Sequence, residues 1–159
     1  MIKLAFIPCK EYSKRLKKKN FKKIKNKYCL DIQIENIKKS KIFDKIYLST
    51  ESKIVNKLIN IKKVIIDKRR KEILKKNTKI HDLLFDFIKR KKLEKKKVII
   101  SVFYPLSIQI TKNDIIKTIS LLDNRNCHSS LIVTNFSHYP ENSLFYKDKF
   151  IKKNKFKYK

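Results

Sequence analysis

Short apolar runs alternate along the chain with longer stretches in which apolar residues recur every three or four positions. The apolar runs predict strands at residues 2–8, 45–49, 63–66, 98–103 and 130–134. Most of these runs are nearly continuous rather than alternating, which is typical of parallel strands buried on both faces. We therefore expect a mostly parallel sheet with helices packed on both sides.

Helical periodicity fills the segments between these predicted strands. We expect helices over residues 28–40, from a Thr50 cap through Leu58, after Thr78, and from Thr111 onward, where Thr-x-x-Asp forms a capping box. The clearest stripe places on one helix face Ile80, Leu83, Leu84, Phe87 and Ile88. Strands that alternate with helices predict βαβ units with right-handed crossovers, so the expected fold class is α/β.

The length of 159 residues suits one domain with a single core. We expect that domain to span residues 1–150, to be incomplete at its C-terminus, and to be followed by a basic tail at residues 151–159. No apolar run approaches the roughly 20 residues that a membrane-spanning helix needs. Residues 4–9 are too short for the apolar core of a signal peptide. These features predict a cytoplasmic protein without a membrane partner.

The net charge of +29 has two competing interpretations. Such a charge can indicate a nucleic-acid partner or another anionic surface. However, the chain has no Gly or Trp and is crowded with Lys, Ile and Asn, whose codons are A/T-rich. Arg is scarce beside Lys, although the Arg guanidinium matches phosphate better. We therefore favour compositional drift in an A/T-rich genome and disfavour a nucleic-acid partner.

No group of side chains has the spacing of a metal site. The cysteines are Cys9, Cys29 and Cys127, and neither they nor the scattered histidines pair at ligand spacing. Asp82 and Asp86 lie four positions apart on one helix face, which we interpret as a solvated acidic edge. The metal ligands, if any, are therefore unknown from the sequence.

The basic loop after the first strand, at residues 10–26, carries the most informative motif. It begins with the sequence Ile-Pro-Cys-Lys-Glu-Tyr-Ser-Lys-Arg-Leu-Lys-Lys-Lys-Asn at residues 7–20. This segment resembles the signature I-P-A-R-G-G-S-K-R-I-P-x-K-N of the acylneuraminate cytidylyltransferase family. Lys10 replaces the Arg of that signature, and Glu11 and Tyr12 replace its two Gly.

Further segments resemble the same family in the same order. Residues 43–51 are similar to its F-D-x-V-x-V-S-T-D strand end, and Arg69 with Glu72 matches its R-P-x-E-L segment without the Pro. Residues 104–107 resemble its Y-P-T-S/A-P loop, and residues 130–140 resemble its S-V-x-x-V segment. The resemblance spans nearly the whole chain, with the first motif and the Ser-Thr-acid strand end as its most specific parts.

This resemblance implies a Rossmann-like, three-layer αβα nucleotidyltransferase fold. It also implies transfer of CMP from CTP to a nonulosonic acid of the sialic or pseudaminic type, which gives a CMP-sugar for surface glycans such as lipopolysaccharide and releases pyrophosphate. Mg²⁺ would be the cofactor, and the partners would be CTP, the acidic sugar and either a second copy or a complementing C-terminal half. Phosphoryl transfer of this kind depends on positioning and charge neutralisation, which cations in the first loop can supply.

The resemblance also assigns roles to individual residues. Lys10 and Lys19 would hold phosphates as the catalytic residues, and Ser13 would donate a hydrogen bond to a phosphate. Asn20 would help to fix the nucleoside, and Arg69 would lie near the base. The remaining nucleotide-binding candidates are Lys14 and Arg15 in the loop, with Ser49 and Thr50 on the pocket floor.

Two alternatives remain open beside an active enzyme. Glu11 places a carboxylate where phosphate charge would collect, and Tyr12 stands where Gly would allow positive φ, so the chain could be an inactive or split remnant of such an enzyme. A basic nucleic-acid-binding protein is the second alternative, and it rests on net charge alone. Tyr104 and the following Pro read more readily as a rigid turn than as a substrate contact.

Overall fold

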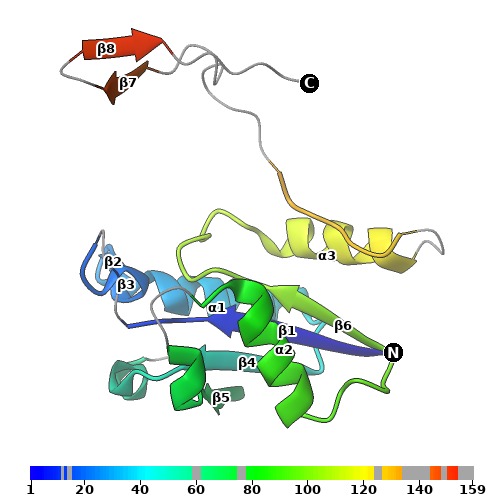
Figure 1. The fold of residues 1–159 in the computed structure, drawn as a ribbon. Helices are drawn as coiled ribbons and strands as arrows, with labels where there is room; N and C mark the ends of the chain where they lie inside the picture. The colour runs from blue at the N-terminus through cyan, green and yellow to red at the C-terminus, as the bar shows by residue number, and fades with distance from the viewer. Residues whose placement is uncertain are drawn as a thin grey trace.

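A four-stranded sheet forms the centre of the protein in a computed structural model, which describes residues 1–11, 13, 16–58, 62–74, 78–123, 127–133, 144–147 and 150–153. The strand order is β5-β4-β1-β6 and every pairing is parallel (Figure 1). The strands are β1 (Ile2–Pro8), β4 (Lys45–Thr50), β5 (Val64–Lys68) and β6 (Val98–Val102). The predicted α/β class and parallel sheet are confirmed.

Helices cover both faces of this sheet (Figure 1). Helices α1 (Cys29–Ser40) and α3 (Lys112–Ser120) pack together on one face, and α2 (Ile80–Arg90) covers the other. Within β1, Ala5 and Ile7 enter the cluster beneath α1 and α3, whereas Leu4 and Phe6 enter the cluster beneath α2. Because both faces of β1 are buried, nearly every position must be apolar, which explains its continuous apolar sequence.

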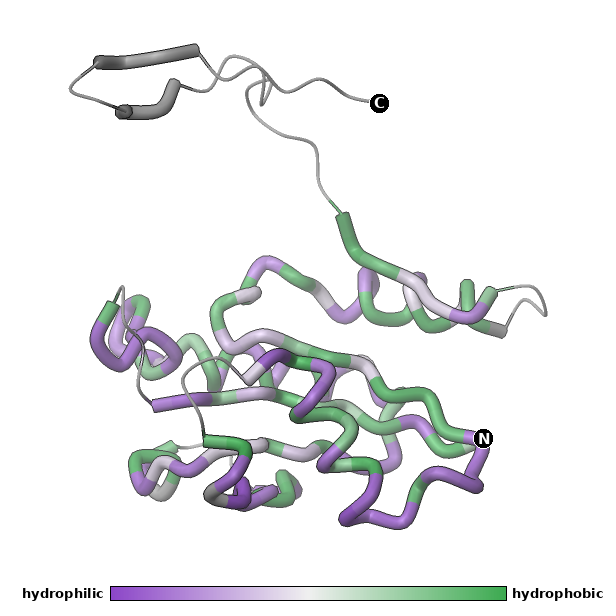
Figure 2. The backbone as a smooth tube through the Cα atoms, viewed as in Figure 1, coloured by the Kyte–Doolittle hydropathy of each residue, from purple (hydrophilic) through white to green (hydrophobic). Residues whose placement is uncertain are grey.

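Shorter elements complete the described chain. An antiparallel pair, β2 (Lys23–Ile24) and β3 (Lys27–Tyr28), follows the first loop, and a second pair joins β7 (Leu144–Lys147) to β8 (Phe150–Lys153). The 3-10 helices are η1 (Lys19–Phe21), η2 (Lys53–Lys57), η4 (Lys71–Leu74) and η5 (Leu121–Asp123). Figure 2 shows that the connection between α2 and β6 is mostly hydrophilic.

Two predicted elements were wrong. The helix expected from Thr50 through Leu58 is only the 3-10 helix η2, and its cap is Ser52, whose Oγ accepts a hydrogen bond from the backbone N–H of Ile54. Residues 130–133 form no strand, and Thr134 lies outside the described residues. A strand needs a paired neighbour, whereas a helix bonds within its own segment, so a local apolar run is weaker evidence for a strand.

The predicted division into a domain at residues 1–150 and a tail at residues 151–159 stays a prediction, although β8 crosses that boundary. Among the described residues, no helix combines the length and apolar character that spanning a membrane requires.

An ion-pair network ties α2 to β5. Asp67 on β5 is fully buried, and its two carboxylate oxygens accept hydrogen bonds from Arg90 at 2.7 and 3.0 Å. Arg90 Nε also donates to Asp86 Oδ2 at 2.7 Å, and Arg70 pairs with the same Asp86 carboxylate. Asp86 is therefore not on a solvated acidic edge as the sequence suggested, because it is 4% exposed. Asp82 instead accepts a hydrogen bond from the backbone N–H of Lys79 at the start of α2.

We expect Asp86→Asn to lower the free energy of unfolding at pH 7 by about 2 kcal/mol, because it leaves Arg70 and Arg90 with a weaker partner. Burial opposes ionisation of Asp86, but hydrogen bonds from Arg90 and Arg70 outweigh it and lower its pKa. A lowered folded-state pKa stabilises the protein above about pH 4 and loses that effect as pH falls through it. Urea titrations between pH 7 and pH 3 should show the two proteins converging at acid pH. The exposed Glu94→Gln is the control, and a pH-independent difference would contradict this account.

Candidate functional site

The carboxyl ends of β1 and β6 meet at the place where the strand order reverses. β1 lies between β4, which follows it through α1, and β6, which the chain reaches only after β5 and α2. In open α/β sheets, ligands bind at the carboxyl edge of the sheet beside such a switch point. The topology therefore places the candidate site around the residues that follow Pro8 and Val102.

A cavity of about 660 Å³ occupies this place. Predicted residues from three separate segments line it: Lys10 and Ser13 after β1, Lys19 and Asn20 on η1, and Arg69 after β5. The structure thus brings together five residues that the sequence named from a resemblance, although they span 60 positions. Their binding roles stay predictions.

Two contacts hold the first loop against the sheet. The side-chain Nδ2 of Asn20 donates a hydrogen bond to the carbonyl oxygen of Lys10 at 2.8 Å, which links η1 to the end of β1. Phe21, the next residue, is 7% exposed and belongs to the core cluster beneath α1. The loop is therefore anchored by a buried ring and closed by an amide, so that Lys10 and Lys19 line the same cavity.

Arg69 is fixed by the end of β4. Its Nε donates to Ser49 Oγ at 3.3 Å, its Nη2 donates to the Ser49 carbonyl oxygen at 2.9 Å, and its Nη1 lies 3.6 Å from Glu51 Oε2. The other oxygen of Glu51 accepts a hydrogen bond from the backbone N–H of Glu11 at 2.9 Å. Glu51 therefore connects the first loop to Arg69, and the sequence did not assign it this position.

The cavity lining is positively charged. Lys10, Lys19, Arg69 and Lys79 contribute cations, and the described residues that line the cavity include no carboxylate. Ile80, the first residue of α2, also lines it, and the N-terminus of a helix favours anions through its partial positive charge. Asp82 in the same turn already accepts the hydrogen bond from the Lys79 N–H. This combination suits an anionic ligand such as a phosphate ester.

The sequence missed the contribution of α2. Thr78, Lys79 and Ile80 line the cavity, but the sequence interpretation treated Thr78 only as the start of a helix. The available signal was that this helix follows a strand end, where α/β sheets place ligands. Tyr104, interpreted as part of a rigid turn, also lines the cavity, and its side chain remains 53% exposed.

Other predicted residues lie elsewhere. Ser49 and Thr50 do not line the cavity, because both are almost fully buried at the end of β4. Ser49 accepts the hydrogen bonds from Arg69, and Thr50 Oγ1 accepts one from the backbone N–H of Ser52 at 3.0 Å. Lys14 and Arg15 lie outside the described residues.

Two kinds of chemistry near the cavity can be assessed from the described residues: nucleophilic attack by a thiol and binding of a metal ion. Burial raises the pKa of Cys9 to about 12, so this thiol stays protonated near neutral pH and is not a nucleophile. Burial also lowers the pKa of Arg69, with Glu51 opposing that effect, but an Arg side chain remains charged. Within the described segments, no three His, Cys, Asp or Glu side chains cluster in a way that could hold a metal ion.

Comparison with known proteins agrees with the fold and identifies the family. The family model described as cytidylyltransferase matches residues 4–87, more than half of the chain and the part that builds most of the cavity. The fold is an α/β domain with a cationic cavity at the carboxyl edge of its parallel sheet. The chain belongs to the cytidylyltransferase family. A search of curated proteins found no match.

Solved structures show the same fold at low sequence identity. The chain is similar to a CMP:2-keto-3-deoxy-manno-octonic acid synthetase complexed with CTP, with a TM-score of 0.62 and 15% identity over 79% of this chain and 48% of that one. It is also similar to a 4-diphosphocytidyl-2C-methyl-D-erythritol synthase, with a TM-score of 0.61 and 13% identity over 78% and 55% of the two chains. The chain is also similar to Rv0371c from Mycobacterium tuberculosis, with a TM-score of 0.58 and 10% identity over 76% of this chain and 60% of that one. The chain spans about half the length of these proteins.

We expect Glu51→Ala to free the first loop from Arg69. Loss of one hydrogen bond to a carboxylate should speed hydrogen exchange of the Glu11 amide about tenfold, because such a bond contributes about 1.5 kcal/mol. Glu51→Gln keeps an oxygen acceptor and should retain most of the protection. Amide exchange followed by NMR measures both variants, and an unchanged Glu11 rate in Glu51→Ala would show that this bond does not hold the loop.

Proposed function

We propose that the cavity at the carboxyl edge of the sheet binds CTP. The observation that carries this proposal is the convergence of Lys10, Lys19 and Arg69 with the N-terminus of α2 around one cavity. Such a set of cations and helix N–H groups is how proteins neutralise a triphosphate. Cytidine is inferred from family membership, and phosphate binding is inferred from the geometry.

The site residues predicted from the sequence have individual proposed roles. Lys10 and Lys19 contact the phosphates, and the Ser13 hydroxyl donates a hydrogen bond to one of them. Asn20 keeps Lys10 in place through its 2.8 Å hydrogen bond and presents its remaining amide oxygen to the nucleoside. Arg69 lies beside the base, where Ser49 and Glu51 hold its guanidinium in a fixed orientation. Lys14 and Arg15 complete the phosphate-binding set in this proposal.

The proposed reaction transfers CMP to a nonulosonic acid of the sialic or pseudaminic type. The anomeric hydroxyl of the sugar attacks the α-phosphorus of CTP, the bond to the β-phosphate breaks in line, and pyrophosphate leaves with the hydroxyl proton released. The lysines act by positioning the phosphates and neutralising the charge that builds on the leaving group. Support comes from the motif resemblance, from family membership, and from similarity to a synthetase that was solved with CTP and is named for another acidic sugar.

Mg²⁺ is the proposed cofactor, but the described residues do not fit a protein-held metal site. They include no cluster of metal-ligating side chains, and Glu11 and Glu51 are joined to each other through a backbone N–H. Mg²⁺ is commonly held by one or two carboxylates together with substrate phosphates. No catalytic step can therefore be assigned to a metal on the residues described.

A second candidate is CTP binding without turnover by this chain alone. It rests on the cationic cavity, which accounts for binding and assigns no catalytic group to the described residues. In this case catalysis would require groups from a complementing polypeptide. Binding and turnover must therefore be measured separately.

We expect the double variant Lys10→Ala, Lys19→Ala to bind CTP about 100-fold more weakly, since it removes two charged hydrogen bonds that contribute about 1.5 kcal/mol each. The matched control combines Lys17→Ala with Lys22→Ala, which also removes two cations, both from exposed positions on the same loop outside the cavity lining. Isothermal titration with CTP measures the affinity. Equal weakening by the double variant and the control would indicate nonspecific charge attraction rather than a site.

Turnover is tested by pyrophosphate release from CTP and Mg²⁺ with sialic, pseudaminic or 2-keto-3-deoxy-manno-octonic acid. Release with one acid and not the others would support the transferase proposal and identify the sugar. CTP binding without release would select the second candidate. Absence of both binding and release would reject the CTP site.

A further inference from the structure

The edge of the sheet formed by β6 has no strand partner within the described part of the chain. β6 pairs with β1 alone, and the flanking bonds from Ile2 N–H to the Lys97 carbonyl and from Phe103 N–H to the Phe6 carbonyl show which groups face β1. Alternate residues of a parallel strand direct their N–H and C=O groups to opposite sides. Val98, Ile100 and Val102 therefore present theirs away from the sheet.

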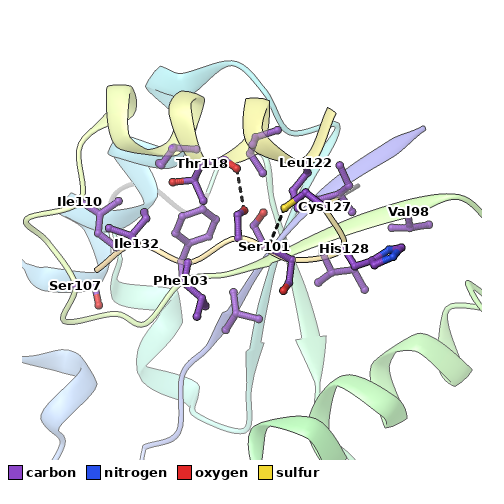
Figure 3. Close-up of a pocket in the computed structure, with 18 of the residues that line it drawn as sticks. Val98, Ser101, Phe103, Ser107, Ile110, Thr118, Leu122, Cys127, His128 and Ile132 are labelled. Carbon is purple, nitrogen blue, oxygen red and sulfur yellow. Dashed lines mark hydrogen bonds between the residues drawn. The ribbon is translucent and has the colours of Figure 1, made fainter. Parts of the chain in front are cut away.

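A second cavity of about 660 Å³ lies along this edge, between β6 and α3 (Figure 3). Its lining is mainly apolar and includes Val98, Phe103, Ile115 and Ile119. Tyr104 lines both this cavity and the proposed nucleotide site. The space is therefore apolar, lies beside unpaired backbone groups, and adjoins the carboxyl edge of the sheet.

Residues 127–132 form the outer wall of this cavity. Figure 3 shows His128 toward the Val98 end of β6 and Ile132 toward the Phe103 end. The wall is fixed to α3 by a hydrogen bond from Ser130 Oγ to the Thr118 carbonyl oxygen at 2.8 Å, and its backbone forms no hydrogen bond with another described backbone group. Leu131 and Val133 are 84% and 83% exposed, which is costly for apolar side chains unless something covers them.

The charge of this chain indicates which kind of polypeptide could pair with the outer edge of β6. A second copy of this chain also carries a charge of +29, so two copies repel each other. The exposed residues Lys95, Lys96 and Lys97 immediately precede Val98, the first residue of β6 and part of the cavity lining. A partner that carries carboxylates at the corresponding end of its segment is complementary to them.

We propose that the slot between β6 and residues 127–133 receives an extended polypeptide strand from outside residues 1–159. This strand pairs with the outward backbone groups of Val98, Ile100 and Val102, places alternate apolar side chains under α3, and directs carboxylates toward Lys95–Lys97. It is an interaction surface of the strand-addition type, in which backbone hydrogen bonds contribute affinity and alternate side chains contribute specificity. The proposal does not depend on the nucleotide site.

The test uses the full chain and a synthetic peptide of alternating Val and Thr with two Glu at each end. A matched peptide carries Lys in place of Glu. Hydrogen exchange followed by NMR should show that the amides of Val98, Ile100 and Val102 exchange rapidly in the free protein. The acidic peptide should slow them at least about tenfold, and the basic peptide should not.

Two variants separate the slot from general charge attraction. Leu131→Glu places a carboxylate on the slot wall and should weaken binding of the acidic peptide about tenfold or more, without altering thermal stability because the native side chain is exposed. Phe85→Glu alters a side chain that is 67% exposed on α2, over the other face, and should leave binding unchanged.

Each contrary outcome overturns the proposal. Protection of the three amides in the dilute free protein would mean that residues 134–159 already fill the slot. Protection that rises with protein concentration would mean that a second copy fills it. No protection at saturating acidic peptide, or equal protection by both peptides, would mean that the slot does not select an acidic strand.

Discussion

The candidate site depends on the bonds that the end of β4 makes with the segments on either side of it. The Ser49 carbonyl oxygen accepts hydrogen bonds from the backbone N–H of Cys9 and from Arg69, so one buried group fixes both the end of β1 and the residue after β5. Glu51 extends this connection to the Glu11 amide. Because these groups are buried or half-buried, leaving any of them unpaired is costly, and the loop must remain at the carboxyl edge of the sheet.

This arrangement concentrates positive charge from separate segments at the cavity at the carboxyl edge of the sheet. Lys is spread over the whole sequence, and most of the Lys side chains that the structure describes are exposed, so the charge of +29 does not by itself indicate a function. At the switch point, however, cations from separate segments line one cavity together with the first turn of α2. Charges that surround one ligand-sized space act together, whereas charges separated on the surface are screened within about 10 Å.

The elements predicted best from the sequence were those with a strong local period. The apolar run of β1, the helical faces of α1 and α2, and the Thr111–Asp114 capping box were all legible in the chain and are all present. The β2–β3 turn could not be predicted from the sequence. Lys25 and Asn26 there adopt φ angles of 46° and 63°, which Gly usually indicates in a sequence, but the chain contains no Gly. Residues 130–133 have a strand-like sequence but pair with no strand among the described residues.

Some residues of the site could be predicted from local sequence, whereas the roles of others depend on the fold. Lys10, Ser13, Lys19, Asn20 and Arg69 could be named because they fall in motifs. The roles of Ser49, Glu51 and Lys79 could not be read from the sequence, since they depend on which strand ends and helix termini meet across the sheet.

The most direct test of the CTP site is a map of backbone amide shifts during titration with CTP. The account predicts saturable shifts at Lys10, Asn20 and Ile80, which belong to three segments that meet only at the cavity. Shifts concentrated at Lys95–Lys97, at the opposite end of β6, would indicate general attraction to a basic surface and would contradict a nucleotide site at the carboxyl edge of the sheet.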